Sequence, residues 1–380
     1  MAHVNEDAAH SPRIVVAPDK FKGSLDAAHV CAAVAAGIRE IAPNARIASV
    51  PIADGGDGTV AAALAAGYVS KSETVTGPVG TPVEAEYALL GDTAVIEMAT
   101  ASGLALLSRD GLDALGATSR GTGELIKAAL DAGARTLVLG IGGSATTDAG
   151  AGMLEALGVR IVTGDGSPVP PGGGGLAQAG RVDLTGLDSR LTDTEIVLAT
   201  DVNNPLTGPD GAAAVYGPQK GADPHDVALL DDSLERFAGL VDAAAADRPG
   251  AGAAGGMGYA AMTVLGATMR QGVDVVLELV GFAEKFDGAD LLVTGEGKLD
   301  RQTLSGKAPA GAAAFARDRG VPVVAVCGAN ELGDDDLAGA SIRAVYSLVD
   351  VEPDLDVCLA EPTRLLTELG RRIAREQLRA

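Results

Sequence analysis

Five charged side chains follow two short apolar segments near the start of the chain. They are Asp19, Lys20, Lys22, Asp54 and Asp57. If the apolar segments, residues 13–17 and 47–52, are parallel strands, these side chains meet at one sheet edge, where α/β proteins bind ligands. Carboxylates beside lysines suit a site for a metal ion, a phosphate group and a substrate carboxylate. At least one or two of the five are expected to be ordinary loop charges in solvent.

Glycines follow a third apolar segment. The run 137–139 leads through Gly140 to Gly142, Gly143 and Ser144, and the segment beyond is predicted to be helical through residue 157. A strand, a glycine turn and a helix present backbone N–H groups to a phosphate or a carboxylate. A tight turn that needs glycine only for its conformation has the same sequence pattern.

The same glycines also match the dinucleotide fingerprint, as Gly140-x-Gly142-x-x-Ala145, and Asp165 lies about 20 residues further on. This match favours, as an alternative, an NAD(P)-dependent dehydrogenase of a small hydroxy acid. However, residues 146–148 are polar where the fingerprint packs helix on strand, and Asp165 lies in a Gly/Pro loop. The dehydrogenase is therefore the second choice.

Other predicted strands also end in polar or glycine-rich turns. The turn 53–59 contains Gly55, Gly56, Gly58 and Thr59. The strand 196–200 is followed by Asp201, Asn203 and Asn204, and a later polar turn holds Gln219 and Lys220. The strand 291–294 is followed by Glu296, Lys298, Asp300, Gln302 and Lys307. Ser24 is placed to cap the first helix. These turns add candidate contacts to the same kind of site.

Composition limits the function further. The chain has 380 residues, enough for two domains, and its 29 basic and 51 acidic residues give a net charge of −22. That charge argues against nucleic acid or an anionic membrane as partner. The three cysteines are unclustered, residues 1–12 lack the apolar segment of a signal peptide, and no apolar run could span a membrane. We expect a soluble cytoplasmic protein.

The order of elements predicts two domains. Segments of β and α character open and close the chain, whereas residues 74–96 alternate and turn like antiparallel strands. We therefore predict an α/β protein in which residues 1–74 and 286–380 form a Rossmann- or flavodoxin-like domain around one five-stranded parallel sheet. Residues 75–285 form a second, inserted domain of mixed α/β structure.

The chemistry that these parts suit is phosphoryl transfer, which needs positioning and charge neutralisation. The four histidines are scattered and form no zinc set, and neither a Walker A motif nor the protein-kinase motifs are present. A two-domain sensor that closes on a small anion without catalysis is a further alternative.

Together these motifs resemble the bacterial type I glycerate kinases. The matching segments are VVAPDKFKGSL (15–25), ADGGDGT (53–59), RGTGELI (120–126), GIGGSATTDAGAGML (140–154), DVNNPL (201–206), GPQKGA (217–222), GAAGGMG (252–258) and GEGKLDRQTLSGK (295–307). The resemblance covers nearly the whole chain and implies ATP-dependent phosphorylation of D-glycerate, usually on the 2-hydroxyl, with Mg²⁺. It also implies an active site in the cleft between two unlike domains. Thr147 and Ala149 depart from the family pattern, which more often has Asn and Gly.

The resemblance suggests a role for each candidate residue. Lys20, Asp201 and Asp54 are assigned to catalysis, with Asp201 favoured as the base, and Asp57 and Asp201 to the metal. The substrate and phosphate contacts are assigned to Asp19, Lys22, Ser24, Gly55, Gly56, Gly58, Thr59, Gly142, Gly143, Ser144, Asn203, Asn204, Gln219, Lys220, Glu296, Lys298, Asp300, Gln302 and Lys307. The protein is expected to act as a monomer or a homodimer.

Overall fold

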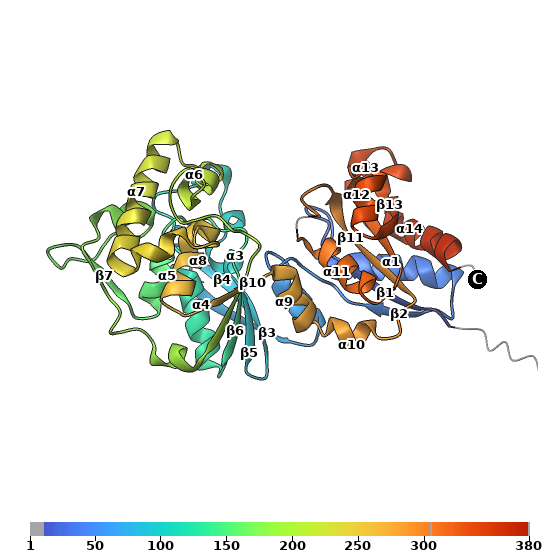
Figure 1. Ribbon diagram of the computed structural model, residues 1–380, viewed down its shortest axis with the longest axis horizontal. Coiled ribbons are helices and arrows are strands. Elements are labelled where there is room, and N and C mark those ends of the chain that lie inside the picture. Colours follow the sequence, from blue (N-terminus) through green and yellow to red (C-terminus); the bar gives the residue numbers. More distant parts are fainter. Residues whose placement is uncertain (1–10, 305, 379–380) are drawn as a thin grey trace, which may run out of the picture. The chain divides into compact units, whose positions relative to one another are not determined.

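The computed structural model describes residues 11–304 and 306–378, and the chain folds into two compact units (Figure 1). Unit 1 contains residues 1–54 and 276–380, and unit 2 contains residues 55–275. Most of residues 1–12, where no signal-peptide segment was predicted, lies outside the described residues, as does Ser305 of the last motif.

Unit 1 is built on one parallel sheet. Its strands are β1 (Arg13–Pro18), β2 (Arg46–Ser49), β11 (Leu291–Leu299), β12 (Val323–Asn330) and β13 (Ile342–Ser347), and its helices are α1 (Ala27–Ile41), α10 (Phe282–Phe286), α11 (Ala308–Arg317), α12 (Asp334–Gly339), α13 (Leu355–Ala360) and α14 (Pro362–Gln377). The strand order β2-β1-β11-β12-β13 is the flavodoxin-like order, and it confirms the predicted five-stranded sheet.

The two faces of this sheet are covered separately. Ile14, Val16 and Val293 share a core with α1 and α14, which pack against each other. Because side chains alternate along a strand, Val15 and Leu292 are buried on the opposite face. The ring of Phe315, on α11, packs edge-on against two phenylalanines of α10. Figure 1 shows α1 and α14 side by side along the sheet.

Unit 2 contains a mixed sheet. Its strands are β3 (Val69–Thr76), β4 (Pro82–Leu90), β5 (Thr93–Glu97), β6 (Thr136–Gly140), β9 (Glu195–Ala199) and β10 (Thr268–Arg270), in the order β10-β9-β6-β5-β4-β3, with β7 (Arg160–Val162) and β8 (Arg181–Asp183) as a separate pair. The pairs β3–β4 and β4–β5 are antiparallel, as residues 74–96 predicted, and the other pairs of the large sheet are parallel.

The helices of unit 2 are α2 (Thr59–Ala65), α3 (Met98–Ser102), α4 (Arg120–Asp131), α5 (Ala151–Ala156), α6 (Ala212–Tyr216), α7 (Pro224–Val241) and α8 (Ala253–Thr263), and α9 (Gly272–Leu279) runs across the boundary. Residues 254–256 of α8 have left-handed backbone angles, so this helix is kinked near its start. The kink lies against the loop that follows β6, as described below.

The boundaries of the units differ from the predicted residues 74/75 and 285/286. Helix α2 packs against β4 and β5, and β3 pairs with β4 along its whole length, so residues from 55 onward belong to unit 2. At the other end, Phe282 and Phe286 pack on Phe315, and this contact holds α10 in unit 1.

Three local expectations are wrong. The cap of α1 is Asp26, whose carboxylate accepts the His29 N–H at 2.8 Å, and not Ser24. Strand β11 continues to Leu299, so Glu296 and Lys298 lie on a strand instead of a loop. The helix expected directly after Ser144 begins only at Ala151.

The remaining sequence expectations concern cysteines and membrane spans. Cys31, Cys327 and Cys358 are all buried free thiols. Among residues 11–304 and 306–378, no helix combines the length and the apolar character needed to cross a membrane.

Candidate functional site

In unit 1, polar side chains gather where β1 ends beside β11. The sheet order reverses between these two strands, and such a switch point is the usual ligand site of an open α/β sheet. Pro18 pairs with Gly295, the Asp19 N–H donates to the Gly295 carbonyl at 2.8 Å, and the Asp19 carboxylate accepts the Lys20 N–H at 2.6 Å. The strand pairing therefore fixes Asp19 and Lys20 next to Glu296.

The electrostatics of this group are unusual. Asp19 is 6% exposed, and burial raises its pKa to about 7. The Lys20 ammonium acts in the opposite direction, whereas the carboxylates of Asp54 and Glu296 add to the rise. A carboxyl group with a pKa near neutral pH can hold or release a proton under physiological conditions, which is what a general base requires.

Glu296 and Lys307 complete the group. Lys307 Nζ lies 3.5 Å from Glu296 Oε2, while Glu296 Oε1 is buried and has no hydrogen-bond partner within the described part of the chain. Burial raises the pKa of Glu296, and the Thr303 hydroxyl and Lys307 oppose that rise. The group thus presents carboxylates and ammonium groups side by side.

Other predicted residues of unit 1 lie outside the group or support it. Lys298 forms a surface ion pair with Glu331, at 2.9 Å between Nζ and Oε2, instead of joining Glu296. Asp300 accepts the backbone N–H groups of Gln302 and Thr303, at 2.9 and 3.3 Å, and so closes a turn. Lys22 and Gln302 are exposed, and the buried Ser24 hydroxyl has no partner among the described residues.

In unit 2, three loops approach so closely that only glycine fits between them. A Cβ at Gly140 would lie 2.6 Å from the Gly55 carbonyl oxygen, and a Cβ at Gly142 would lie 3.0 Å from Gly56 Cα. A Cβ at Gly55 would lie 2.6 Å from Gly272 Cα, and the Gly272 N–H donates to Asp201 Oδ1 at 3.3 Å. The structure therefore brings Gly55, Gly56, Gly142 and Asp201 together.

The start of α2 is already occupied by a carboxylate that the sequence did not reveal. Glu97, at the end of β5, accepts the Gly58 N–H at 3.1 Å and the Val60 N–H at 2.6 Å through Oε1. The Thr59 hydroxyl donates to the Gly56 carbonyl at 2.7 Å. Gly58 and Thr59 therefore shape the loop internally, which is a correction to their assignment as phosphate contacts.

A buried polar centre follows Ser144. The Asp148 carboxylate is fully buried and accepts hydrogen bonds from Ser119 N and Oγ at 2.8 Å, from Gly150 N at 3.1 Å and from Gly152 N at 3.2 Å. Burial raises the pKa of Asp148, and these hydrogen bonds oppose the rise. Ala149 takes a left-handed φ of 52°, a backbone conformation that glycine adopts with less strain than alanine.

Lys220, expected as a substrate or phosphate contact in a polar turn, belongs to this buried centre. Its side chain is 1% exposed, and its Nζ donates to Ser144 Oγ at 3.0 Å and to the Thr146 carbonyl at 2.5 Å. Burial lowers its pKa to about 7, with Asp148 acting in the opposite direction. Lys220 lies on the short 3₁₀ turn Pro218–Lys220, and neither its depth nor its partners could be seen in the sequence.

Only part of the loop after β6 reaches solvent. Gly142 and Gly143 are exposed, Ser144 is 8% exposed, and residues 145–150 are buried. Asn204 links neighbouring loops, because its side chain donates to the Asp210 carbonyl and accepts from the Tyr216 hydroxyl, both at 2.8 Å. Asn203 and Gln219 are exposed.

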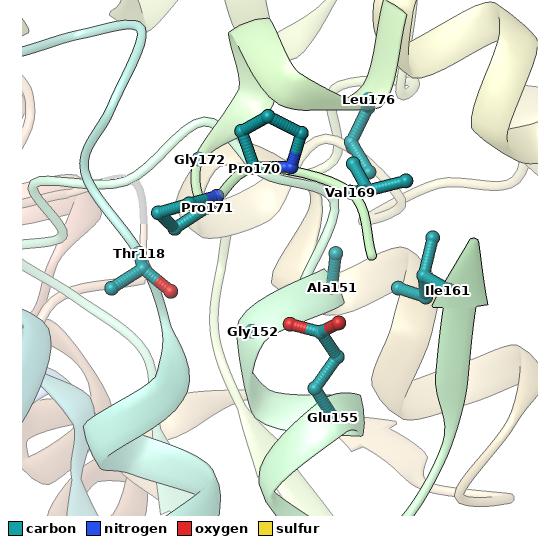
Figure 2. A pocket seen from close by; sticks show the side chains of 10 residues that line it. All are labelled: Thr118, Ala151, Gly152, Glu155, Ile161, Val169, Pro170, Pro171, Gly172 and Leu176. Atoms are coloured by element: carbon teal, nitrogen blue, oxygen red, sulfur yellow. The ribbon is translucent and has the colours of Figure 1, made fainter. Parts of the chain in front are cut away.

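A small pocket lies between α5 and the proline-rich loop before Gly172 (Figure 2). Its cavity volume is about 10 Å³, which is room for one water molecule. Glu155 extends its carboxylate into this space on the side of Ala151 and Gly152, and burial raises the pKa of Glu155. The pocket is too small for a metabolite and is separate from the glycine loops.

The dinucleotide interpretation does not fit this geometry. Its fingerprint needs a helix directly after the glycines, but α5 begins only at Ala151. Asp165 lies in an exposed turn, where it accepts hydrogen bonds from Thr163 and Ser167. The neighbouring strand β7 pairs with β8 and lies outside the large sheet.

Comparison with known proteins gives one consistent result. A family model described as the glycerate kinase family matches residues 14–378. A glycerate kinase of Bacillus subtilis is 45% identical, covering 95% of this chain and 97% of that protein. A glycerate 2-kinase of Escherichia coli is 46% identical, with 85% and 86% covered. A crystal structure described as putative glycerate kinase 2 from Salmonella typhimurium has a TM-score of 0.84 at 41% identity, covering 96% and 98%.

Proposed function

The chain belongs to the glycerate kinase family and is a kinase, and on that premise we propose that it transfers the γ-phosphoryl group of ATP to the 2-hydroxyl of D-glycerate. The products are 2-phosphoglycerate and ADP. The choice of the 2-hydroxyl is supported by the relative named glycerate 2-kinase, which is 46% identical. Membership of the glycerate kinase family argues against the two alternatives, a dehydrogenase and a non-catalytic anion sensor.

The observation that carries this proposal is the group at the switch point of unit 1. A hydroxyl acceptor needs a base for its proton, and a substrate carboxylate needs a cation. Asp19, with a pKa of about 7, offers the base, and Lys20 and Lys307 offer ammonium groups beside it. We assign the proton to Asp19 in preference to the exposed Asp201 because the pKa of Asp19 lies near the working pH.

The transfer step balances with these groups. The 2-hydroxyl oxygen forms a bond to the γ-phosphorus of ATP, the bond from that phosphorus to the β,γ-bridging oxygen breaks, and ADP leaves with the electron pair. The hydroxyl proton passes to the Asp19 carboxylate. Lys20 and Lys22 hold the glycerate carboxylate or the transferred phosphoryl group.

The phosphates of ATP are assigned to unit 2. Gly142 and Gly143 expose their backbone, Ser144 adds a hydroxyl, and Gly55 and Gly56 lie against them. Consecutive backbone N–H groups in glycine loops form the cradles that phosphates occupy. The loops approach each other so closely that a side chain at Gly55 or Gly140 would collide with the neighbouring backbone.

Mg²⁺ fits the carboxylates next to the glycine loops. Within residues 11–304 and 306–378 no cluster of three or more His, Cys, Asp or Glu side chains is arranged for a metal. Mg²⁺ does not need one, since it usually binds one or two carboxylates together with phosphate oxygens and water. Asp57 and Asp201, on two adjoining loops, would hold the ion, which when bound neutralises charge on the phosphates.

The test is a product-resolved assay. Purified protein is incubated with ATP, Mg²⁺ and D-glycerate, ADP release is coupled to a readout, and enolase is added with or without phosphoglycerate mutase. An enolase signal without mutase identifies 2-phosphoglycerate and supports the proposal. A signal that requires the mutase identifies 3-phosphoglycerate and contradicts the regiochemistry. No ADP release with intact ATP binding contradicts glycerate as the substrate.

A further inference from the structure

The chemistry of an ammonium group restricts what Ser144 can do. Lys220 Nζ donates one hydrogen bond to the Thr146 carbonyl, and in its protonated form the ammonium group has three N–H donors and no acceptor, so in that form the Ser144 oxygen accepts from Lys220. The distance from Lys220 Nζ to Ser144 Oγ is 3.0 Å. The proton of the Ser144 hydroxyl must therefore point away from Lys220, toward some other acceptor.

The surroundings leave one direction for that proton. Within the described residues, the hydrogen bond from Lys220 is the one that involves the Ser144 hydroxyl, and no side chain or carbonyl there accepts its proton. Ser144 directly follows the exposed Gly142 and Gly143 and is itself 8% exposed. Ser144 therefore stands in the chain between the exposed glycines of this loop and the buried segment that contacts Lys220.

The segment that carries Ser144 is held in place by long-range contacts. The Ala145 N–H donates to the Ser102 carbonyl at 2.9 Å, and the Ala149 N–H donates to the Gly255 carbonyl at 3.0 Å. Lys220 adds a 2.5 Å hydrogen bond to the Thr146 carbonyl. Ser144 consequently has little freedom to turn away, and its oxygen stays in reach of the ammonium group.

We propose that Lys220 is a positioning residue that orients the Ser144 hydroxyl, so that Ser144 donates its proton to a phosphate oxygen of bound ATP while Lys220 itself touches no substrate. This inference rests on the proposed function, because it concerns the phosphate-binding part of the same site. It also reverses the role expected for Lys220, which the motif had suggested as a direct contact.

A double-mutant cycle tests the coupling. Ser144→Ala, Lys220→Met and the double variant are compared with the wild type in the Kd of MgATP, measured by calorimetry, and in kcat and KM. Loss of the Ser144 hydrogen bond is expected to raise the Kd of MgATP about tenfold. If Lys220 acts through Ser144, the double variant binds no more weakly than the worse single variant.

The opposite results overturn the inference. Losses that multiply in the double variant would mean that Lys220 contacts ATP itself, and an unchanged Kd in Ser144→Ala would mean that Ser144 donates no hydrogen bond to ATP. Lys127→Met, which changes an exposed lysine on α4, is the matched control and is expected to leave the Kd, kcat and thermal stability unchanged.

A second measurement needs no variant and covers the case in which Lys220→Met does not fold. The native protein is treated with an amine-acylating reagent, with and without MgATP, and the modified lysines are identified by mass spectrometry. We expect Lys220 to stay unmodified in both samples while Lys127 reacts in both. Modification of Lys220 that MgATP suppresses would overturn the inference.

The two proposals fail differently. Binding of MgATP without turnover of D-glycerate would overturn the proposed function, and the cycle in Kd would still decide the role of Lys220. Normal formation of 2-phosphoglycerate with multiplying losses in the cycle would overturn the inference alone.

Discussion

Glu97 Oε1 lies 2.6 Å from the backbone nitrogen of Val60, and it also accepts the Gly58 N–H at 3.1 Å. A side chain at the end of β5 thereby satisfies two N–H groups at the start of α2, whose cap Gly58 has no side chain of its own. The loop that carries Gly55, Gly56 and Asp57 is fixed from within unit 2 by this carboxylate.

Glu97→Gln should therefore destabilise the protein. The variant replaces two charge-assisted hydrogen bonds by at most neutral ones, so we expect the free energy of unfolding to fall by about 1–3 kcal/mol. Thermal unfolding measures the change, with the exposed Glu73→Gln on β3 as the matched control. Equal melting temperatures for the two variants would show that Glu97 does not hold the loop.

Asp19→Asn should remove a pH dependence of stability. The Asp19 carboxyl has a pKa of about 7 in the folded protein and an ordinary value of 3.8. Between these values the folded state binds more protons than the unfolded state, so its stabilising contribution is complete below pH 4 and is lost as the pH rises through 7.

The asparagine variant does not suffer this loss. At pH 8 we expect it to exceed the wild type in free energy of unfolding by about 2–4 kcal/mol, and near pH 4 the two should converge. Urea unfolding at pH 5 and pH 8 measures the difference. Asp287→Asn, at an exposed aspartate of unit 1, should show no such trend, and a pH-independent gain for Asp19→Asn would contradict the burial argument.

Lys20→Ala and Asp201→Asn should each reduce turnover with little change in thermal stability. Both side chains are assigned to charged steps of the reaction, and removal of one such group costs about 10²–10³ in kcat. Asparagine at position 201 keeps an oxygen acceptor for the Gly272 N–H, now 3.3 Å from Asp201 Oδ1. Steady-state kinetics and thermal unfolding measure the two effects, and a melting temperature that falls with the activity would reveal a structural role.

Ser341→Gly should stabilise unit 1. Ser341 follows α12 with a left-handed φ of 60°, and its N–H donates to the Ala338 carbonyl at 3.0 Å, as at a helix C-terminus. Glycine adopts this conformation without strain, so we expect a gain of about 0.5–1 kcal/mol in urea unfolding. Ala340→Gly changes the preceding residue, whose φ is −82°, and should instead lose a similar amount. The same sign for both variants would contradict the argument.

The strands of unit 1 were predictable because a buried parallel strand is a continuous apolar run. Residues 14–17 and 291–293 are such runs, and both belong to strands that have a neighbour on each side. The continuation of β11 was not predictable, since Gly295 and charged neighbours are typical of a loop. Gly295 is required by close packing, because a Cβ there would lie 1.8 Å from the Val326 carbonyl oxygen.

The parts of the site in loops that follow predicted strands were predictable, whereas the burial of individual side chains was not. The meeting of Asp19 with Asp54 follows from neighbouring strands that end at one sheet edge, whereas Gly55 and Gly142 follow strands of two different sheets and their approach was not predictable in this way. The burial of Lys220 depends on Ser144 and Thr146, which lie more than seventy positions earlier in the chain. No local pattern encodes a partner at that distance, so a buried lysine and a surface lysine look the same in the sequence.

The two-segment construction of unit 1 has a consequence for the order in which the protein is made. The Thr294 hydroxyl bonds to the Ala17 carbonyl, although 277 positions separate the two residues. Unit 2 is a single continuous segment, so its core can close while the ribosome is still adding residues 276–380. Until β11 has been synthesised, strand β1 lacks one of the two strands with which it pairs. Folding of unit 1 therefore needs contacts between two segments that the whole of unit 2 separates in the chain, and such non-local pairing is slow.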